Sequence, residues 1–257
     1  MFYYDPKRPT IMQAYELLGT LYPQRTLDIH YLTPLEFLIF AILSQRTRHQ
    51  DAVAAFDSLM LEFETLVNVL RAPTKQIELI VTRSTWPDVK AERIKLALGA
   101  VHYWRNGQMN LEQLRNMSDW EASVWMENLP DVGRKTAWCV LLFSTLRRAV
   151  LPVDTGFKRF AIRYGILSAS TNWAQAHFAL LRQIPRGWNA DQVEIFHNTL
   201  KRFIQSYCKA EPACLDCPLR EMCVFGRNNG PEGSGLAIER RKRHSSFQES
   251  PWQLEFV

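Results

Sequence analysis

Four of the five cysteines in this chain lie within 16 residues, and no other feature of the sequence constrains the fold as strongly. They are Cys208, Cys214, Cys217 and Cys223, separated by five, two and five residues. Gaps this short allow one loop to wrap around a single centre, so the pattern predicts a site held by four thiolates. In a cytosolic chain, clustered cysteines indicate metal ligands rather than disulfides. On spacing alone, zinc and an iron–sulfur cluster both remain open.

The composition indicates a globular protein and argues against a membrane protein. The 257 residues are 47% hydrophobic and 22% charged, which suits one large domain or two small ones. The longest apolar stretch, residues 35–43, contains Glu36 and is far shorter than the roughly 20 residues that a membrane span needs. The first eight residues lack the pattern of a signal peptide, so we expect a cytoplasmic protein, associated with the nucleoid if the source is bacterial.

Helix signals dominate the chain. Thr33-Pro34-Leu35-Glu36 has the pattern of a capping box, and the apolar run after it predicts a buried helix. Ser118 and Glu121 repeat the capping pattern, and Asn110 opens a shorter helix. Further helices are expected over about 10–20, 50–63, 75–83, 90–105, 134–147, 155–165, 173–183 and 190–207. Because no segment alternates like a strand, we expect an all-α fold.

The composition changes after the last clustered cysteine. Residues 228–235 are rich in Gly, Asn and Pro, and residues 239–244 are mostly basic. Such a segment has the composition of a flexible linker followed by a solvated basic run. We therefore expect residues 227–257 to form a basic, flexible tail.

The segment Leu129-Pro-Asp-Val-Gly-Arg-Lys-Thr-Ala137 predicts a tight turn between two helices. Pro130 and Gly133 bracket the turn, and the second helix would start near Arg134. The free backbone N–H groups of that first turn, together with the helix dipole, can hold a phosphate. The candidate DNA-binding residues of this segment are Val132, Gly133, Arg134 and Thr136.

Positive charge is concentrated in the same region. Residues 132–165 contain seven Lys or Arg against one acidic residue, a net charge of +6 in a chain whose total is +5. Concentrated basic residues are typical of contact with a nucleic-acid backbone. Lys158 and Arg159 join the candidate DNA-binding residues on this ground.

Lys135 and Asp154 are the candidate catalytic residues. Asp154 follows an extended Pro-Val pair and precedes a helical pattern, which suits an N-cap. The two residues are 19 positions apart, and a helix of about 13 residues with a short return could bring them together. A neutral lysine amine is a nucleophile, and a nearby carboxylate can stabilise positive charge.

These motifs closely resemble those of the helix-hairpin-helix DNA glycosylases, in particular the endonuclease III branch. The resemblance covers about residues 25–224, with three separated motifs in the correct order. It implies that Lys135 and Asp154 are the catalytic lysine and aspartate, and that the four clustered cysteines bind a [4Fe-4S] cluster. Gln45, in Leu43-Ser-Gln-Arg-Thr47, matches a glutamine that enters the DNA minor groove. Trp86 matches the position that fills the space left by a flipped base.

The resemblance implies two α-helical domains, one over 26–147 and one joining 1–25 to 148–226. It also implies a monomer that acts on double-stranded DNA containing a damaged base or an abasic site. The expected activity is that of a base-excision-repair glycosylase with AP lyase activity, which removes an oxidised pyrimidine and cuts 3′ to the abasic site by β-elimination.

Two alternatives remain open at the level of the sequence. The first is a monofunctional glycosylase, although such enzymes usually lack a lysine at the position of Lys135. The second is a non-catalytic protein that uses the hairpin as a phosphate clamp. Three departures from the family pattern bear on this choice: Asp131 replaces the first hairpin glycine, Gly156 replaces a histidine, and the first gap between cysteines is five residues rather than six. Asp tolerates a positive φ better than most residues, but its carboxylate would weaken phosphate binding.

Overall fold

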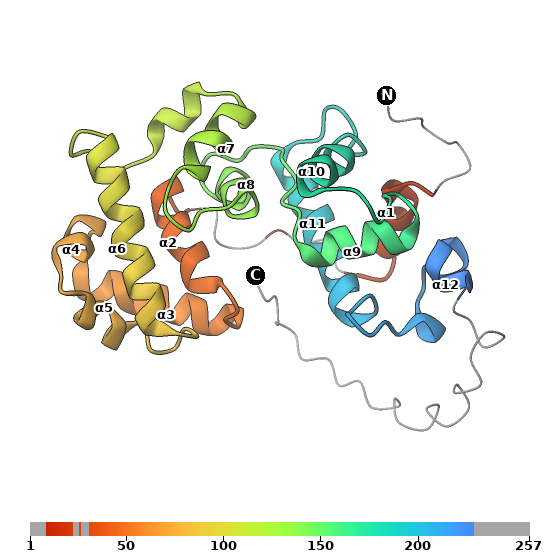
Figure 1. Cartoon of the computed structure of the whole chain (residues 1–257), viewed down its shortest axis with the longest axis horizontal. Helices are drawn as coiled ribbons and strands as arrows, with labels where there is room; N and C mark the ends of the chain where they lie inside the picture. Colours follow the sequence, from red (N-terminus) through yellow and green to blue (C-terminus); the bar gives the residue numbers. More distant parts are fainter. Residues whose placement is uncertain (1–8, 23–25, 27–30, 229–257) are drawn as a thin grey trace. The chain divides into compact units, whose positions relative to one another are not determined.

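The computed structural model describes residues 9–22, 26 and 31–228, and in these residues every regular element is a helix (Figure 1). The sequence therefore predicted the fold class correctly. No helix in the described ranges is long and apolar enough to cross a bilayer. The tail predicted over 227–257 lies outside the described residues from position 229 onward, and residues 227–228 close the last helix.

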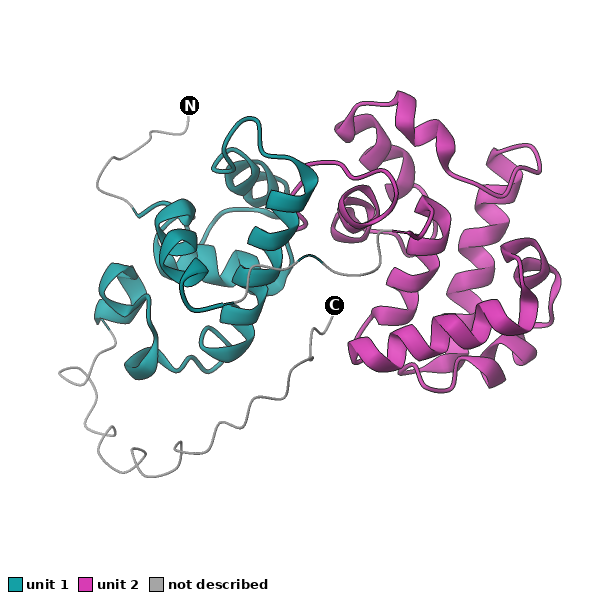
Figure 2. Ribbon diagram, turned by 180° about the vertical axis from the view of Figure 1, so that it is seen from behind, with its two compact units in different colours: residues 1–26, 153–250 teal, residues 27–152, 251–257 magenta. Residues whose placement is uncertain are grey.

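The described chain divides into two compact units, coloured separately in Figure 2. Unit 1 contains residues 9–22, 26 and 153–228, and unit 2 contains residues 31–152. The division falls between 152 and 153, whereas the sequence placed it near 147. Residues 148–152 therefore belong with unit 2, where Arg148 reaches back to Asp119 and to the carbonyl of Arg115.

Unit 2 is built around two buried helices, α2 and α8. Phe37 of α2 stacks on Phe143 of α8 with ring centres 5.9 Å apart, and Phe40 meets Phe56 of α3 at 6.0 Å. The capping box predicted at Thr33 and Glu36 is present and fixes the start of α2. The elements of unit 2 are α2 (Pro34–Ser44), α3 (His49–Phe63), α4 (Leu66–Arg71), α5 (Thr74–Ile80), α6 (Pro87–Trp104), η1 (Glu112–Asn116), α7 (Asp119–Glu127) and α8 (Arg134–Phe143).

Unit 1 is organised by α11, whose apolar side packs on α1 and α9. Tyr15 of α1 contacts Phe196 of α11 edge-on at 5.1 Å, and Phe160 of α9 contacts Phe203 at 5.6 Å. The elements of unit 1 are α1 (Ile11–Gly19), α9 (Thr155–Tyr164), α10 (Trp173–Leu181), α11 (Ala190–Ser206), η2 (Cys214–Asp216), η3 (Arg220–Met222) and α12 (Val224–Asn228).

The structure differs from the helix predictions at α8 and at α4, among others. Helix α8 ends at Phe143 rather than near 147, because Ser144 is extended and Thr145 donates its N–H to the Leu32 carbonyl. Helix α4 was not predicted. It has only six residues, too few for a periodic pattern, although its Thr65 N-cap accepts a hydrogen bond from the Asn68 N–H.

Candidate functional site

The predicted hairpin lies between α7 and α8 of unit 2, which pack against each other. Asp131 has φ 59°, the left-handed conformation that a glycine would adopt without strain. The Val132 N–H closes the turn on the Leu129 carbonyl at 3.2 Å, and both side chains are buried. The turn therefore forms with aspartate in the position of the first hairpin glycine.

The Asp131 carboxylate has a partner. Its Oδ2 lies 3.5 Å from Nε of Arg93 on α6, and Arg93 also donates to Oε1 of Gln45 at 2.8 Å. The charge expected to repel a phosphate is thus balanced within unit 2 by a half-exposed ion pair. The same arginine connects the hairpin to Gln45, the residue that follows α2. Sequence analysis missed Arg93 because it belongs to no motif.

The N-terminus of α8 is free to bind an anion. No side chain in the described part of the chain caps it, whereas Ser118 caps α7 and Asp154 caps α9. Gly133, the N-cap of α8, has φ −90°, and a Cβ placed on it would meet nothing within 4 Å. Neither backbone conformation nor packing requires glycine there. The missing side chain leaves the first-turn N–H groups accessible, as close approach of a phosphate requires.

Lys135 lies in the first turn of α8 and is half-buried, as is the neighbouring Thr136. Among the described residues, the Lys135 amine has no hydrogen bond or ion pair. Arg134 differs: its guanidinium binds Glu127 through two hydrogen bonds of 3.0 and 3.2 Å and lies 4.7 Å from the centre of the Trp120 ring. Lys135 is therefore the uncommitted cation of this turn.

Most of the other basic residues in 132–165 hold loops of the protein itself. Arg147 donates to the Leu142 carbonyl, and Arg159 donates twice to the Cys208 carbonyl. Lys158 lies 4.8 Å over the Trp173 ring. Fewer of these basic side chains are available to a ligand than the sequence indicated. Among the described residues, only Lys135 and Lys158 of this segment lack an oxygen partner.

Asp154 caps α9 as predicted, and its Oδ1 accepts a hydrogen bond from the Phe157 N–H at 2.8 Å. No cation of the described residues pairs with its carboxylate. A Cβ on Gly156 would lie 3.1 Å from that Oδ1 and 3.0 Å from Ile204. The glycine that replaces the family histidine therefore leaves room for the Asp154 carboxylate. Lys135 belongs to unit 2 and Asp154 belongs to unit 1.

Trp86 is the N-cap of α6 in a left-handed conformation, φ 53° and ψ 62°. Its side chain is 52% exposed. The Arg46 guanidinium, next to Gln45, lies 5.4 Å from the centre of the Trp86 ring. The structure therefore places the turn after α2 beside the turn before α6.

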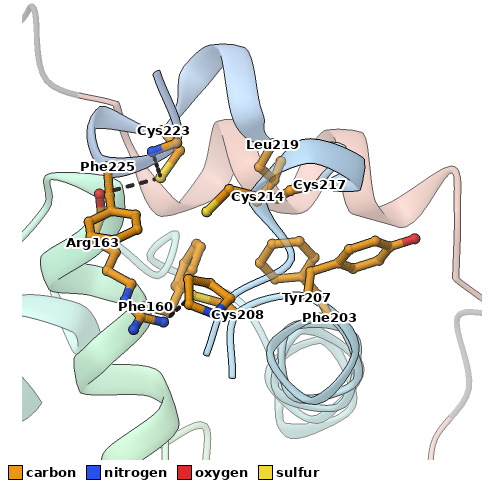
Figure 3. A pocket seen from close by; sticks show the side chains of 12 residues that line it. Phe160, Arg163, Phe203, Tyr207, Cys208, Cys214, Cys217, Leu219, Cys223 and Phe225 are labelled. Atoms are coloured by element: carbon orange, nitrogen blue, oxygen red, sulfur yellow. Dashed lines mark hydrogen bonds between the residues drawn. The ribbon is translucent and has the colours of Figure 1, made fainter. Parts of the chain in front are cut away.

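The four clustered cysteines line one pocket of unit 1 (Figure 3). Cys208 follows α11, Cys214 begins η2, Cys217 immediately follows η2, and Cys223 immediately precedes α12. Aromatic side chains also line the pocket, among them Phe160 of α9 and Phe203 of α11.

Polar groups converge on the sulfur atoms. The Gly226 N–H points to Cys223 Sγ at 3.4 Å, and Arg163 Nη1 lies 3.7 Å from Cys208 Sγ. Arg163 also donates to the Ala210 carbonyl at 2.8 Å, which fixes the start of the loop. Burial, together with smaller effects of the neighbouring thiols, raises the pKa of the Cys217 thiol to about 11. Arg163 lies in the last turn of α9, and the sequence indicated it only as one of the basic residues in 132–165, not as a partner of the cysteine loop.

The thiols of the pocket are accompanied by a buried hydroxyl that lacks a hydrogen-bond partner among the described residues. In the described residues, no three Cys, His, Asp or Glu side chains are grouped closely enough to hold a single metal ion. Among the described residues, the buried Tyr164 hydroxyl has no hydrogen-bond partner, and the Cys223 and Cys217 thiols contribute, after burial itself, to raising its pKa. This hydroxyl can therefore still donate a hydrogen bond to a group held by the neighbouring thiols.

The amino-acid sequence is similar to those of known DNA repair proteins. A protein of Arabidopsis thaliana that is named as a DNA glycosylase is 32% identical over 193 residues, which cover 72% of this chain and 64% of that protein. Endonuclease III of Thermotoga maritima is 27% identical over 199 residues, which cover 77% of this chain and 85% of that enzyme. The chain therefore spans slightly less than two thirds of the Arabidopsis protein. No family model matches the chain.

Solved structures of endonuclease III and of a thymine-DNA glycosylase have a similar fold. A trapped covalent intermediate of endonuclease III with DNA has a TM-score of 0.68 at 23% identity, covering 86% of this chain and 98% of that one. In sequence and in fold, the chain is similar to helix-hairpin-helix DNA glycosylases. It is endonuclease III-like. A thermostable thymine-DNA glycosylase has the same fold, with a TM-score of 0.64 at 22% identity over 85% of this chain and 95% of that one.

Proposed function

We propose that this endonuclease III-like protein is a base-excision DNA glycosylase with AP lyase activity. Its substrate is double-stranded DNA that contains an oxidised pyrimidine or an abasic site. The observation that carries the proposal is the uncommitted Lys135 amine in the first turn of α8, beside N–H groups that no side chain caps. A lysine with no internal partner, next to a phosphate-sized anion site, is what a nucleophile directed at the sugar of a nucleotide requires.

The proposed reaction begins with the target base outside the stack, because its sugar carbon is inaccessible inside a duplex. The neutral Lys135 amine attacks C1′, and the base leaves with the electron pair of the glycosidic bond and a proton. One amine proton goes to the departing base and the other goes to O4′ as the C1′–O4′ bond breaks, so that a Schiff base forms between the lysine nitrogen and C1′ of the opened sugar. Removal of a C2′ proton then expels the 3′ phosphate by β-elimination, which cuts the strand.

Asp154 has two roles in this proposal. Its charge stabilises the positive charge that develops on the sugar as the base departs, and it accepts a proton from Lys135. The single hydrogen bond from Phe157 fixes the carboxylate without neutralising it. The proposal assigns both residues to one reaction on the strength of the family motif.

A panel of lesion duplexes tests the proposal. A duplex carrying an oxidised pyrimidine should be cut 3′ to the lesion, whereas the undamaged duplex should remain intact. An abasic site without a nick would indicate the monofunctional alternative. Binding with no change to the DNA would indicate the non-catalytic clamp, and either result would contradict the proposed lyase activity.

We also propose that Cys208, Cys214, Cys217 and Cys223 bind a [4Fe-4S] cluster. When bound, the cluster would supply four iron–sulfur bonds that hold the loop from residue 208 to residue 223 in place. The loop has few apolar side chains of its own, so it depends on such bonds for its structure. The Gly226 N–H, Arg163 and the Tyr164 hydroxyl would donate to its sulfur atoms.

Purified protein should be yellow-brown and hold about four iron atoms and about four acid-labile sulfides per chain. Cys214→Ser should bleach the colour and lower the melting temperature of unit 1, because one ligand is lost. Cys139→Ala is the matched control, since Cys139 is buried in α8 of unit 2 and should leave the colour unchanged. A colourless protein with one zinc per chain would contradict the cluster.

Trp86→Ala should weaken binding to a lesion duplex about tenfold, because base–aromatic stacking is typically worth about 1–3 kcal/mol per base. The melting temperature should change little, since half of the side chain is exposed. Trp104→Ala is the matched control, because Trp104 is also partly exposed but lies at the opposite end of α6. A large loss of stability with unchanged affinity would contradict a stacking role for Trp86.

A further inference from the structure

Lys90 is a buried cation that the proposed chemistry does not use. It lies on the apolar face of α6, with Ala91 and Ile94, and only 2% of it is exposed. Its ammonium donates to the Leu43 carbonyl at 2.6 Å and to Oγ1 of Thr47 at 2.5 Å. No carboxylate in the described part of the chain pairs with it. Burial, together with a smaller effect of the Arg93 charge, lowers the pKa of Lys90 to about 8.

An unpaired buried charge opposes folding, since an apolar side chain of similar volume fills such a site without the loss of hydration. Methionine would pack along the same path as the lysine stem. The reason for a lysine at this position therefore lies in what its ammonium holds. Both of its acceptors belong to the end of α2 and the turn that follows, residues 43–47.

The Thr47 hydroxyl joins this turn to the one before α6. It accepts from Lys90 and from the Thr85 N–H at 3.0 Å, and it donates to the Gln45 carbonyl at 3.2 Å. The Thr85 hydroxyl in turn donates to the Arg46 carbonyl at 2.8 Å. Lys90 thus anchors a continuous set of hydrogen bonds that joins residues 43–47 to residues 84–86, which we call the paired turns.

Each of the paired turns contains one residue in a strained conformation. Arg46 has φ 52° and Trp86 has φ 53°, in the left-handed region that side-chain-bearing residues rarely adopt. The two side chains face each other at 5.4 Å and are exposed, while the backbone behind them is hydrogen-bonded and buried. Strained residues of this kind persist only where their surroundings hold them, and they concentrate at binding sites.

We propose that Lys90 is a positioning residue that locks the paired turns together so that Gln45 and Trp86 enter the DNA as one rigid unit. The proposal rests on the assignment of these two residues as DNA contacts. It adds that their placement is set from inside the protein, by a lysine that never touches the DNA. Loss of the ammonium should therefore affect DNA binding more than it affects folding.

Lys90→Met tests this division, with a duplex containing a stable abasic-site analogue as the probe. The Kd should weaken about tenfold, the loss expected when one stacking contact on DNA is misplaced. The melting temperature should stay unchanged or rise, because a buried charge is removed and volume is kept. Lys95→Met is the matched control: Lys95 lies on the same helix and also donates to a backbone carbonyl, that of Ala72, away from the paired turns.

Hydrogen exchange at the Thr85 amide gives a second readout that needs no DNA. That amide donates to Thr47 in the wild type, so it should exchange faster in Lys90→Met and at the wild-type rate in Lys95→Met. If Lys90→Met does not fold, Thr47→Val takes its place, because it removes the hydroxyl that joins the turns and should give the same two changes.

If the Thr85 amide exchanges at the wild-type rate in Lys90→Met, Lys90 does not hold the paired turns together. If that amide exchanges faster but the affinity for DNA is unchanged, the contact between the paired turns does not contribute to DNA binding. An equal loss of affinity in Lys95→Met would also overturn that contribution, since a general effect on α6 would then explain the result. If the wild type does not bind lesion DNA at all, the proposed function fails, while the exchange measurement still decides whether Lys90 holds the paired turns.

Discussion

Replacement of Lys135 by alanine should abolish strand cleavage at an abasic site and leave DNA binding nearly intact. Loss of a covalent nucleophile should lower the rate by at least about 10³-fold, because no other group in the first turn of α8 can form the Schiff base. Binding should survive because the free backbone N–H groups at the N-terminus of α8 remain. Cleavage on gels and binding by fluorescence anisotropy measure the two effects separately.

Two further variants sharpen this result. Lys135→Arg should be as inactive as the alanine variant, since a guanidinium stays protonated and cannot attack C1′. Lys75→Ala should cleave at the wild-type rate, because the Lys75 amine is paired with Glu78 at 2.6 Å on the surface of unit 2. Rapid cleavage by Lys135→Ala would assign the reaction to another amine.

Replacement of Asp154 by asparagine should lower glycosylase turnover about 10²–10³-fold, a typical cost of removing one preorganised electrostatic interaction from a transition state. Asparagine can still accept the hydrogen bond from the Phe157 N–H, so the cap of α9 and the melting temperature should be kept. Single-turnover kinetics with excess enzyme isolate this step from product release.

Asp154→Ala separates the two functions of this residue. It should lose the same activity and, in addition, about 1 kcal/mol of stability, because it also removes the N-cap. The double variant with Lys135→Ala should lose little more activity than the worse single variant, as expected for residues that act as a unit. Full activity in Asp154→Asn would show that the carboxylate serves only as a cap.

The sequence predicted those features that short local patterns determine. The capping residues Thr33 and Ser118 mark helix starts that the structure reproduces, because an N-cap depends only on neighbours three residues away. Asp131 adopts the positive φ expected of it. The four cysteines line one pocket because their spacing leaves a short loop little alternative.

The partners of individual side chains could not be predicted from the sequence, because they depend on contacts between segments that are far apart in the chain. Arg159 and Arg163 appeared as part of a DNA-facing charge, yet both hold the start of the cysteine loop, 45 or more residues away. Arg93 reaches both Gln45 and Asp131, and no local pattern singles it out. The sequence contains one signal for Lys90: it lies on the apolar face of α6, where a charged residue is unexpected. A search for buried charged residues would have found it.

The assignment of Lys135 as the nucleophile is the central claim, and the chemical identity of a trapped adduct tests it most directly. Wild-type protein should be incubated with an abasic-site duplex in the presence of borohydride, which reduces the Schiff base to a stable amine. After digestion with protease and nuclease, mass spectrometry should find the sugar remnant on the peptide containing Lys135 and on no other lysine. Attachment to a different amine, or no covalent adduct at all, would contradict the claim.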